Sequence, residues 1–320
     1  MSPARPLLIA HRGASGERPE HTLAAYARGA RQGADAIEPD LVATRDGHLV
    51  ARHENEISET TDVATRAAFA DRRTTKTIDG VERTGWFTED FDLAELKRLR
   101  AVERLPHLRP ASAAHDGRFE IPTLAEILAL VRQLGSELGR PVGVYPEIKH
   151  PAFFAGLGLD LEPRVADALA AAGYRARSDL AWVQSFEPSA LRTLRGLTDL
   201  RLVQLVDLPD ADRLGPDDLA AVAAHADVLG PHKALVVPVG GDGALARPTS
   251  LVRDAHAVGL AVHAWTVRAE NAFLPPALRS SSDEAAHGDV AAEVRALVAA
   301  GVDGLFSDHP ALAAAALPSR

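Results

Sequence analysis

Short runs of apolar and β-branched residues alternate along this chain with longer segments whose apolar residues recur every three or four positions. The first pattern predicts buried strands and the second predicts amphipathic helices. The runs predict strands at 7–11, 35–44, 48–54, 141–149, 180–186, 201–206, 226–231, 261–267 and 302–307. The longer segments predict helices at 21–33, 123–135, 162–173, 188–196, 217–225, 250–258 and 290–300.

Strands that alternate with helices indicate parallel strands joined by helical crossovers. The chain has no glycine-rich dinucleotide fingerprint, so a closed (β/α)8 TIM barrel is favoured over a doubly wound sheet. The predicted strands exceed the barrel's requirement by one. Asp46-Gly47 lies between two extended runs and predicts a hairpin, so we interpret one of these runs as an excursion from the rim.

Two stretches interrupt the alternation, at about 55–119 and 268–289. Neither has a sustained apolar period of its own, so we expect insertions over the barrel mouth instead of separate folding units. The prediction is therefore a single domain over 1–320, with the first insertion capping the C-terminal face of the barrel.

Composition narrows the possible partners of the protein. The 320 residues carry a formal net charge of −9, which disfavours binding to nucleic acid or to an anionic membrane surface. A phosphate ligand would then need a local positive site. The chain has no cysteine, which removes disulfides, thiolate zinc sites and a cysteine nucleophile.

No stretch approaches the roughly twenty apolar residues that a membrane-spanning helix needs, so we expect no stable membrane insertion. The beginning of the sequence lacks the apolar run and the cleavage site of a secretory signal. As written, the protein is expected in the cytoplasm, or in the periplasm or medium if the sequence is a processed form. The sequence leaves the oligomeric state open.

Ionisable and polar residues lie at the predicted carboxyl ends of the strands, where the active sites of TIM barrels are built. They are His11, Arg12, Glu38, Asp40, His53, Glu147, Lys149, Gln184, Trp265 and Asp308. Because side chains alternate along a strand, Glu38 and Asp40 share one side, as do Glu147 and Lys149.

Three carboxylates that converge on a barrel interior would repel one another and lose their hydration unless a cation lay among them. Oxygen ligands favour Mg²⁺ or Ca²⁺, and the sequence does not separate the two. The two histidines titrate near neutral pH and suit acid and base roles, and Arg12 and Lys149 offer donors to an anion. This set of groups indicates phosphoryl transfer.

The segments "AHRGASGERPEHTLAAY", "GADAIEPDLVATRDGHLVARHE", "YPEIKHP", "VQSFEPSAL", "AWTVR" and "GVDGLFSDHP" follow one another in the order typical of a known family. With them the chain resembles the glycerophosphodiester phosphodiesterase family from residue 7 to about 310. The long insertion after His53 resembles the branch that includes the bacterial periplasmic enzymes, in which it caps the site.

The resemblance implies that His11 and His53 are the acid and base, and that Glu38, Asp40 and Glu147 bind one divalent cation, Ca²⁺ or Mg²⁺. It further implies phosphate contacts from Arg12 and Lys149. The implied reaction is hydrolysis of a small glycerophosphodiester, such as glycerophosphocholine or glycerophosphoethanolamine, to glycerol 3-phosphate and an alcohol. Water and the substrate's own 2-hydroxyl both stay open as the first nucleophile.

Other positions have two interpretations. Trp265 suits substrate contact or ordinary barrel packing, and Lys149 suits phosphate binding or neutralisation of Glu147. Gln184, Phe186 and Asp308 are weaker candidates for the site.

The chain departs from the family pattern twice. Glu54 follows His53 where most members have aspartate, which leaves the partner of that histidine open, and His21 replaces the common asparagine in Glu20-His21-Thr22. Thr22 also predicts a helix N-cap.

Two alternatives to this function remain. A barrel that resembles sphingomyelinase D or phosphatidylinositol-specific phospholipase C would act on intact lipids such as lysolipids or sphingolipids. A barrel without activity would bind glycerophosphodiesters for uptake or sensing.

Overall fold

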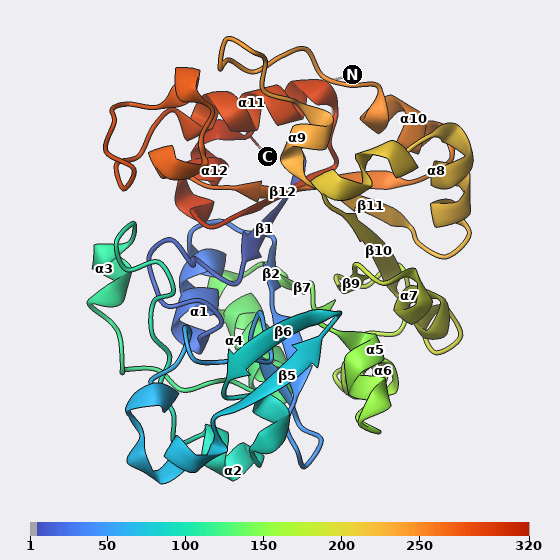
Figure 1. Cartoon of the computed structure of the whole chain (residues 1–320). Helices are drawn as coiled ribbons and strands as arrows, with labels where there is room; N and C mark the ends of the chain where they lie inside the picture. Colours follow the sequence, from blue (N-terminus) through green and yellow to red (C-terminus); the bar gives the residue numbers. More distant parts are fainter. Residues whose placement is uncertain (1–4, 320) are drawn as a thin grey trace.

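Eight parallel strands close into a barrel in the computed structural model, which describes residues 5–319 apart from the side chains of 211–213 (Figure 1). Two of the eight are interrupted. The strands are β1 (Leu7–His11), β2 (Ala36–Glu38) with β3 (Asp40–Ala43), β7 (Gly143–Val144) with β8 (Glu147–Ile148), β9 (Trp182–Ser185), β10 (Arg201–Val206), β11 (Val228–Pro231), β12 (Ala261–Val267) and β13 (Gly304–Ser307). The predicted TIM barrel is confirmed.

The ring closes through the two interrupted strands. On one side β13 pairs with β1, β1 with β2 and β2 with β7; on the other, β3 pairs with β8 and β8 with β9. Pro39 and Pro146 lie at the interruptions. Proline has no N–H to donate to the ladder, so pairing stops there and resumes beyond it.

Helices cover the outside of the barrel, and those predicted from the sequence occur within a few residues of their expected bounds. The longer ones are α1 (Leu23–Arg31), α4 (Leu124–Leu138), α6 (Leu161–Ala171), α7 (Pro188–Arg195), α8 (Pro216–Ala223), α10 (Leu251–Ala257), α11 (Val290–Ala300) and α12 (Pro310–Ala316). The short ones are α2 (Leu93–Leu96), α3 (Pro110–Ala113), α5 (Pro151–Gly156) and α9 (Lys233–Val236).

Helix α1 begins where the sequence predicts, because the Thr22 hydroxyl accepts a hydrogen bond from the backbone N–H of Ala25 at 3.1 Å. Gly13, directly after β1, has a φ of 88°, and a Cβ there would lie 2.4 Å from the carbonyl carbon of Ala25. Only glycine lets the chain leave β1 at this angle and still pack on α1.

The Asp46-Gly47 hairpin is confirmed. Strand β4 (Leu49–Ala51) pairs antiparallel with β3, and Gly47 has a φ of 81°. This run is therefore the extra strand beyond the eight of the barrel, and it delivers His53 to the barrel mouth.

The segment 55–119 contains a second hairpin that the sequence analysis missed. Strands β5 (Thr74–Ile78) and β6 (Val81–Gly85) pair antiparallel around Asp79 and Gly80, whose φ angles are 49° and 80°. Two positive φ angles in a two-residue loop are those of a type I′ turn. Short helical turns flank the hairpin: η1 (Val63–Thr65), η2 (Ala67–Arg72) and η3 (Thr88–Asp90).

The segment 268–289 contains only the turns η5 (Asn271–Phe273) and η6 (Pro276–Leu278), and η4 (Leu208–Arg213) follows β10.

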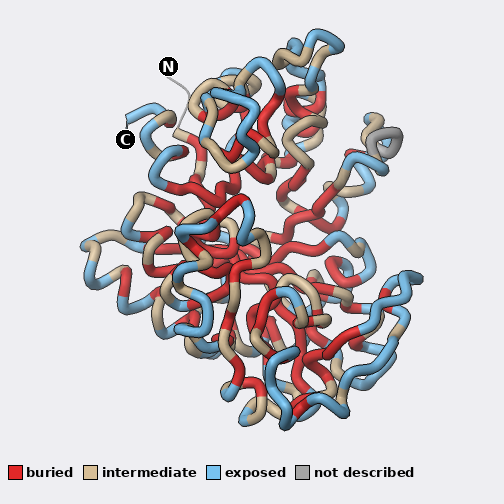
Figure 2. Tube along the Cα trace, turned by 60° about the vertical axis from the view of Figure 1, so that its left-hand side comes forward, coloured by how far each residue is buried: buried red, intermediate tan, exposed pale blue. Residues whose placement is uncertain are grey.

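Buried residues form two layers, one inside the barrel and one between the strands and the helices (Figure 2). Inside, Tyr145 stacks on Trp182 with ring centroids 5.2 Å apart, and its hydroxyl lies 2.8 Å from Nδ1 of His263. The barrel interior is therefore packed and is no channel, which leaves the carboxyl ends of the strands as the place for a site. Among the described residues no helix is long and apolar enough to cross a membrane.

Candidate active site

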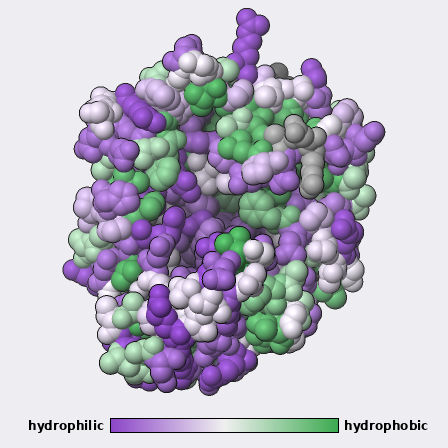
Figure 3. Space-filling view, viewed as in Figure 1, coloured by the Kyte–Doolittle hydropathy of each residue, from purple (hydrophilic) through white to green (hydrophobic). Residues whose placement is uncertain are grey.

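A cavity of about 390 Å³ lies at the carboxyl ends of the strands. It contains most of the side chains that the sequence analysis proposed for the site. The face seen in Figure 3 is hollowed near its centre, with both hydrophilic and hydrophobic residues around the hollow. The lining residues are His11, Arg12, Glu38, His53, Arg104, Glu147, Lys149, Gln184, Phe186, Leu205, Asp207, Trp265, Arg268 and Phe306.

Three buried carboxylates meet at this end of the barrel. Oxygens of Glu38, Asp40 and Glu147 all lie within 4.8 Å of one another. The backbone explains the meeting: Glu38 ends β2, Asp40 begins β3, and Asp40 is paired with Glu147 in the β3–β8 ladder. The proximity expected from alternation along the strands is confirmed.

These carboxylates fit a divalent cation. Burial and the neighbouring carboxylates raise the pKa of Glu38 well above its usual range, and burial raises the pKa of Glu147 to about 7. Both groups are thus unfavourable as anions with no cation among them. Oxygen ligands at this spacing suit Mg²⁺ or Ca²⁺, whose positive charge would offset the repulsion.

Polar groups behind the carboxylates fix their orientation. The Nε2 of His21 lies 2.9 Å from Oδ2 of Asp40, and the amide of Gln184 donates to Oε1 of Glu38 at 3.1 Å. The backbone N–H of Arg12 donates to Oε2 of Glu38 at 2.8 Å, and its guanidinium lies 3.2 Å from Oδ2 of Asp40. Although burial opposes it, Arg12 and His21 hold the pKa of Asp40 well below its usual range.

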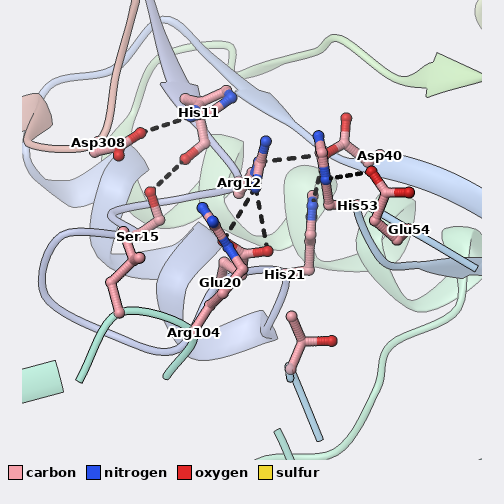
Figure 4. A network of polar contacts seen from close by, with 12 residues as sticks. His11, Arg12, Ser15, Glu20, His21, Asp40, His53, Glu54, Arg104 and Asp308 are labelled. Atoms are coloured by element: carbon pink, nitrogen blue, oxygen red, sulfur yellow. Dashed lines mark hydrogen bonds and ion pairs between the residues drawn. The ribbon is translucent and has the colours of Figure 1, made fainter. Parts of the chain in front are cut away.

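His11 is held by a carboxylate behind the cavity wall (Figure 4). Its Nδ1 lies 2.6 Å from Oδ1 of Asp308. The other oxygen, Oδ2, accepts from Arg109 at 2.5 Å and from Arg268 at 2.9 Å. With Nδ1–H donated to Asp308, the lone pair of His11 resides on Nε2. Asp308 thus belongs to the site but lies behind His11 and does not line the cavity.

His53, which follows β4, also has a carboxylate at Nδ1. Its Nδ1 lies 3.0 Å from Oε1 of Glu54, and its Nε2 lies 3.4 Å from Nζ of Lys149. Glu54, which replaces the usual aspartate, therefore reaches the same histidine that it follows. Nζ of Lys149 is also 2.9 Å from Oε1 of Glu147, so this lysine joins the histidine to the acidic cluster.

Burial disfavours the charged form of both histidines. Burial and the charge of Arg12 lower the pKa of His11 to about 4. Burial and the charges of Arg12 and Lys149 lower the pKa of His53 to about 3. A neutral imidazole is able to accept a proton at Nε2, and in His53 this atom faces Nζ of Lys149.

Trp265 and Phe186 form an aromatic wall of the cavity. Their ring centroids lie 5.8 Å apart, and the Trp265 indole donates to the carbonyl of Gly230 at 2.8 Å. Nζ of Lys149 lies 5.7 Å from the centre of the Phe186 ring. Trp265 thus packs against its neighbours and also lines the cavity.

Sequence reasoning missed several functional residues around the cavity. His21 had been noted only as a departure from the family pattern, whereas it is buried against Asp40. Arg104 and Arg268 line the cavity, and Arg109 lies behind Asp308. No strand-end position or motif marked Arg104 and Arg109, because they lie in the inserted segment. Arg268 ends the segment "AWTVR" and directly follows β12, and this position was the available signal for it.

Comparisons with known proteins agree with this geometry. The model of the glycerophosphoryl diester phosphodiesterase family matches residues 11–312. A glycerophosphodiester phosphodiesterase of Arabidopsis thaliana is 35% identical over 332 residues, covering 96% of this chain and 85% of that protein. One of Haemophilus influenzae is 30% identical over 303 residues, covering 82% and 79%.

Solved structures show the same fold. An Oleispira antarctica phosphodiesterase, in complex with the product sn-glycerol-3-phosphate, is similar with a TM-score of 0.65 at 22% identity, over 98% of this chain and 96% of that one.

Proposed function

This chain belongs to the glycerophosphoryl diester phosphodiesterase family, and we propose that it hydrolyses small glycerophosphodiesters to sn-glycerol 3-phosphate and an alcohol by metal-dependent acid–base catalysis. Glycerophosphocholine and glycerophosphoethanolamine are the substrates we expect. The observation that carries the proposal is one cavity lined by two histidines, four cationic side chains, and Glu38 and Glu147 of the carboxylate cluster. The product bound to the Oleispira antarctica enzyme supports the same product here.

Glu38, Asp40 and Glu147 would hold the cation, Mg²⁺ or Ca²⁺. When bound, the cation supplies positive charge against the phosphodiester oxygens, which stabilises the charge that develops during the reaction. Behind the cluster, His21 would keep Asp40 in place before the cation binds, and Gln184 and the backbone of Arg12 would do the same for Glu38.

His11 and His53 would exchange the protons of the reaction. One, as the neutral ring, accepts a proton from the attacking hydroxyl at Nε2, and the other, as the imidazolium, donates its Nε2 proton to the leaving alcohol. Asp308 and Glu54 support both roles, because a carboxylate at Nδ1 fixes the tautomer and stabilises the imidazolium when it forms. This is the role of the aspartate in serine protease triads.

Lys149 and Arg12 would bind the phosphate. Nζ of Lys149 lines the cavity beside Glu147 and His53. The guanidinium of Arg12 contacts Glu20 at 3.1 Å and Asp40 at 3.2 Å, so its orientation is fixed before a substrate arrives. Arg104 and Arg268 add positive charge to the same cavity. Trp265 and Phe186 would border the glycerol or the alcohol.

We propose further that residues 1–320 act as one catalytic domain. Arg109, in the first inserted segment, contacts Glu270 in the second at 2.6 Å and Asp308 at the barrel mouth at 2.5 Å. Both insertions thus contribute to the surroundings of the same cavity.

Release of glycerol 3-phosphate from glycerophosphocholine and glycerophosphoethanolamine tests the proposal. Activity should disappear with EDTA, return with Mg²⁺ or Ca²⁺, and be lost in His11→Ala. His256→Ala is the matched control, because His256 is half-exposed and pairs with Asp303 away from the cavity. Turnover that survives complete metal removal or His11→Ala would contradict the mechanism. Activity on lysolipid or sphingolipid alone would favour a lipid phosphodiesterase instead, and binding without turnover a sensing or uptake protein.

A further inference from the structure

We propose that the inserted segment 55–119 positions both histidines of the cavity, through Asp79 on one side and Arg109 on the other. The inference rests on the proposed acid–base roles of His11 and His53. It gives the insertion a part in catalysis beyond covering the barrel mouth.

The first contact path runs from the tip of the β5–β6 hairpin to His53. Oδ2 of Asp79 lies 2.5 Å from Nδ1 of His150, and Nε2 of His150 lies 3.2 Å from Oε2 of Glu54. The other oxygen of Glu54 lies 3.0 Å from Nδ1 of His53. Asp79 itself is exposed, whereas the His150 side chain is largely buried between the two carboxylates.

His150 suits this linking position. Both of its ring nitrogens face carboxylate oxygens, so the doubly protonated ring is the form that satisfies both contacts. Although burial opposes it, the hydrogen bonds to Glu54 and Asp79 raise the pKa of His150. A protonated His150 fixes the second oxygen of Glu54, and the first is then directed at His53.

Unusual backbone angles occur along this contact path and beside the carboxylate cluster. Among the described residues, four that are not glycine have a positive φ: Arg12, His21, Asp79 and His150. Arg12 and His21 contact the metal-binding carboxylates, and the other two form the outer part of this path. The type I′ turn accounts for the positive φ of Asp79. No such turn contains His150, so turn geometry does not account for its φ of 50°. Such conformations concentrate at functional sites.

The second contact path reaches His11. Arg109 precedes α3 and is buried, and its guanidinium donates to Glu270 at 2.6 Å, to the backbone carbonyl of Ser15 at 3.1 Å and to Oδ2 of Asp308 at 2.5 Å. Arg109 therefore fixes the oxygen of Asp308 that faces away from His11. The other oxygen remains directed at Nδ1 of that histidine.

Asp79 offers a test that leaves the core intact. Asp79→Gly keeps the positive φ that the turn needs and removes the carboxylate, whereas Asp79→Asn keeps the turn and an oxygen that accepts from His150. His150→Asn tolerates the left-handed backbone but is too short to reach Glu54. Asp71→Asn removes an exposed carboxylate of the same insertion and is the matched control.

We expect kcat for glycerophosphocholine, at saturating divalent cation, to fall about tenfold in Asp79→Gly and more in His150→Asn, because small displacements of a catalytic group are costly. KM and the thermal midpoint should change little, Asp79→Asn should recover most of the loss, and Asp71→Asn should equal wild type. Arg109→Lys should also lower kcat, because one ammonium group cannot serve three acceptors in the fork geometry of a guanidinium.

Values of kcat within twofold of wild type in Asp79→Gly and His150→Asn would overturn the proposal, as would a loss that follows the thermal midpoint and is not rescued by asparagine. The proposed function fails separately. If wild type is inactive, or His53→Ala is as active as wild type, the acid–base roles are wrong. If His53 is essential and the outer variants are fully active, only the role of the insertion is wrong.

Discussion

Asp308→Asn is the most informative single change near the histidines, because its surroundings determine how the new amide must lie. Arg109 and Arg268 present only donors to Oδ2 of Asp308. The amide oxygen of asparagine would therefore face the two arginines, and its NH₂ would face Nδ1 of His11. That ring nitrogen must then accept a hydrogen bond, which moves the ring proton to Nε2.

This tautomer is wrong for either role of His11. A base needs the lone pair on Nε2, and an acid needs the imidazolium, whose Nδ1–H would meet the NH₂ group. Restoring the productive form costs about 1–3 kcal/mol for the lost hydrogen bond. The missing carboxylate charge adds about 2 kcal/mol, half of the roughly 4 kcal/mol for unit charges near 4 Å, because the two arginines already offset part of it. Together these are about 3–5 kcal/mol, so at about 1.4 kcal/mol per tenfold kcat should fall by ~10²–10⁴.

The assay is release of glycerol 3-phosphate under saturating divalent cation, with KM and the thermal midpoint measured on the same preparations. Asp303→Asn is the control, because Asp303 also contacts a histidine: its Oδ2 lies 2.8 Å from Nε2 of His256. Asp303 precedes β13 and therefore lies at the opposite end of the barrel from the cavity. It should retain wild-type kcat. A kcat for Asp308→Asn within threefold of wild type would refute the tautomer argument.

Two more predictions concern the carboxylate cluster. Burial raises the pKa of Glu147 to about 7, whereas the value in the unfolded chain is 4.5. The contribution of Glu147 to stability is therefore complete below about pH 4.5 and is lost as the pH rises through 7. The thermal midpoint of metal-free protein should therefore fall from about pH 5 to pH 8 by more than that of Glu147→Gln, and equal slopes would contradict this. His21→Leu removes the contact at 2.9 Å behind Asp40 and should raise the cation concentration for half-maximal activity by ~10–100-fold, with kcat at saturating cation little changed. Unchanged cation dependence would show that His21 does not orient Asp40.

The barrel was predictable because its signals are local. Each strand is an apolar run between amphipathic helices, and Asp46-Gly47 identifies the extra strand. The β5–β6 hairpin escaped the same reasoning because most of its residues are exposed and present no apolar face. Asp79-Gly80 was the available signal, since it is the same dipeptide as Asp46-Gly47.

The candidate site likewise has residues that the sequence predicts and contacts that it does not. His11, Glu38, Asp40 and Glu147 follow from their positions at strand ends, because the fold alone brings those ends together. The contacts behind them span long sequence separations: Arg109 and Asp308 are 199 residues apart. No periodicity or motif links such a pair, so only the folded structure reveals it.

The carboxylate cluster and the groups that contact the histidines thus come partly from different parts of the chain. The carboxylates and the groups behind them belong to the strands and to the loop after β1, whereas the carboxylates that hold the histidines are fixed partly by Asp79 and Arg109 of the insertion. A change behind the cluster should therefore alter the cation requirement, and a change in the insertion should alter kcat at saturating cation. Because the two effects have different readouts, a variant that moved both together would indicate that the insertion also shapes the metal site.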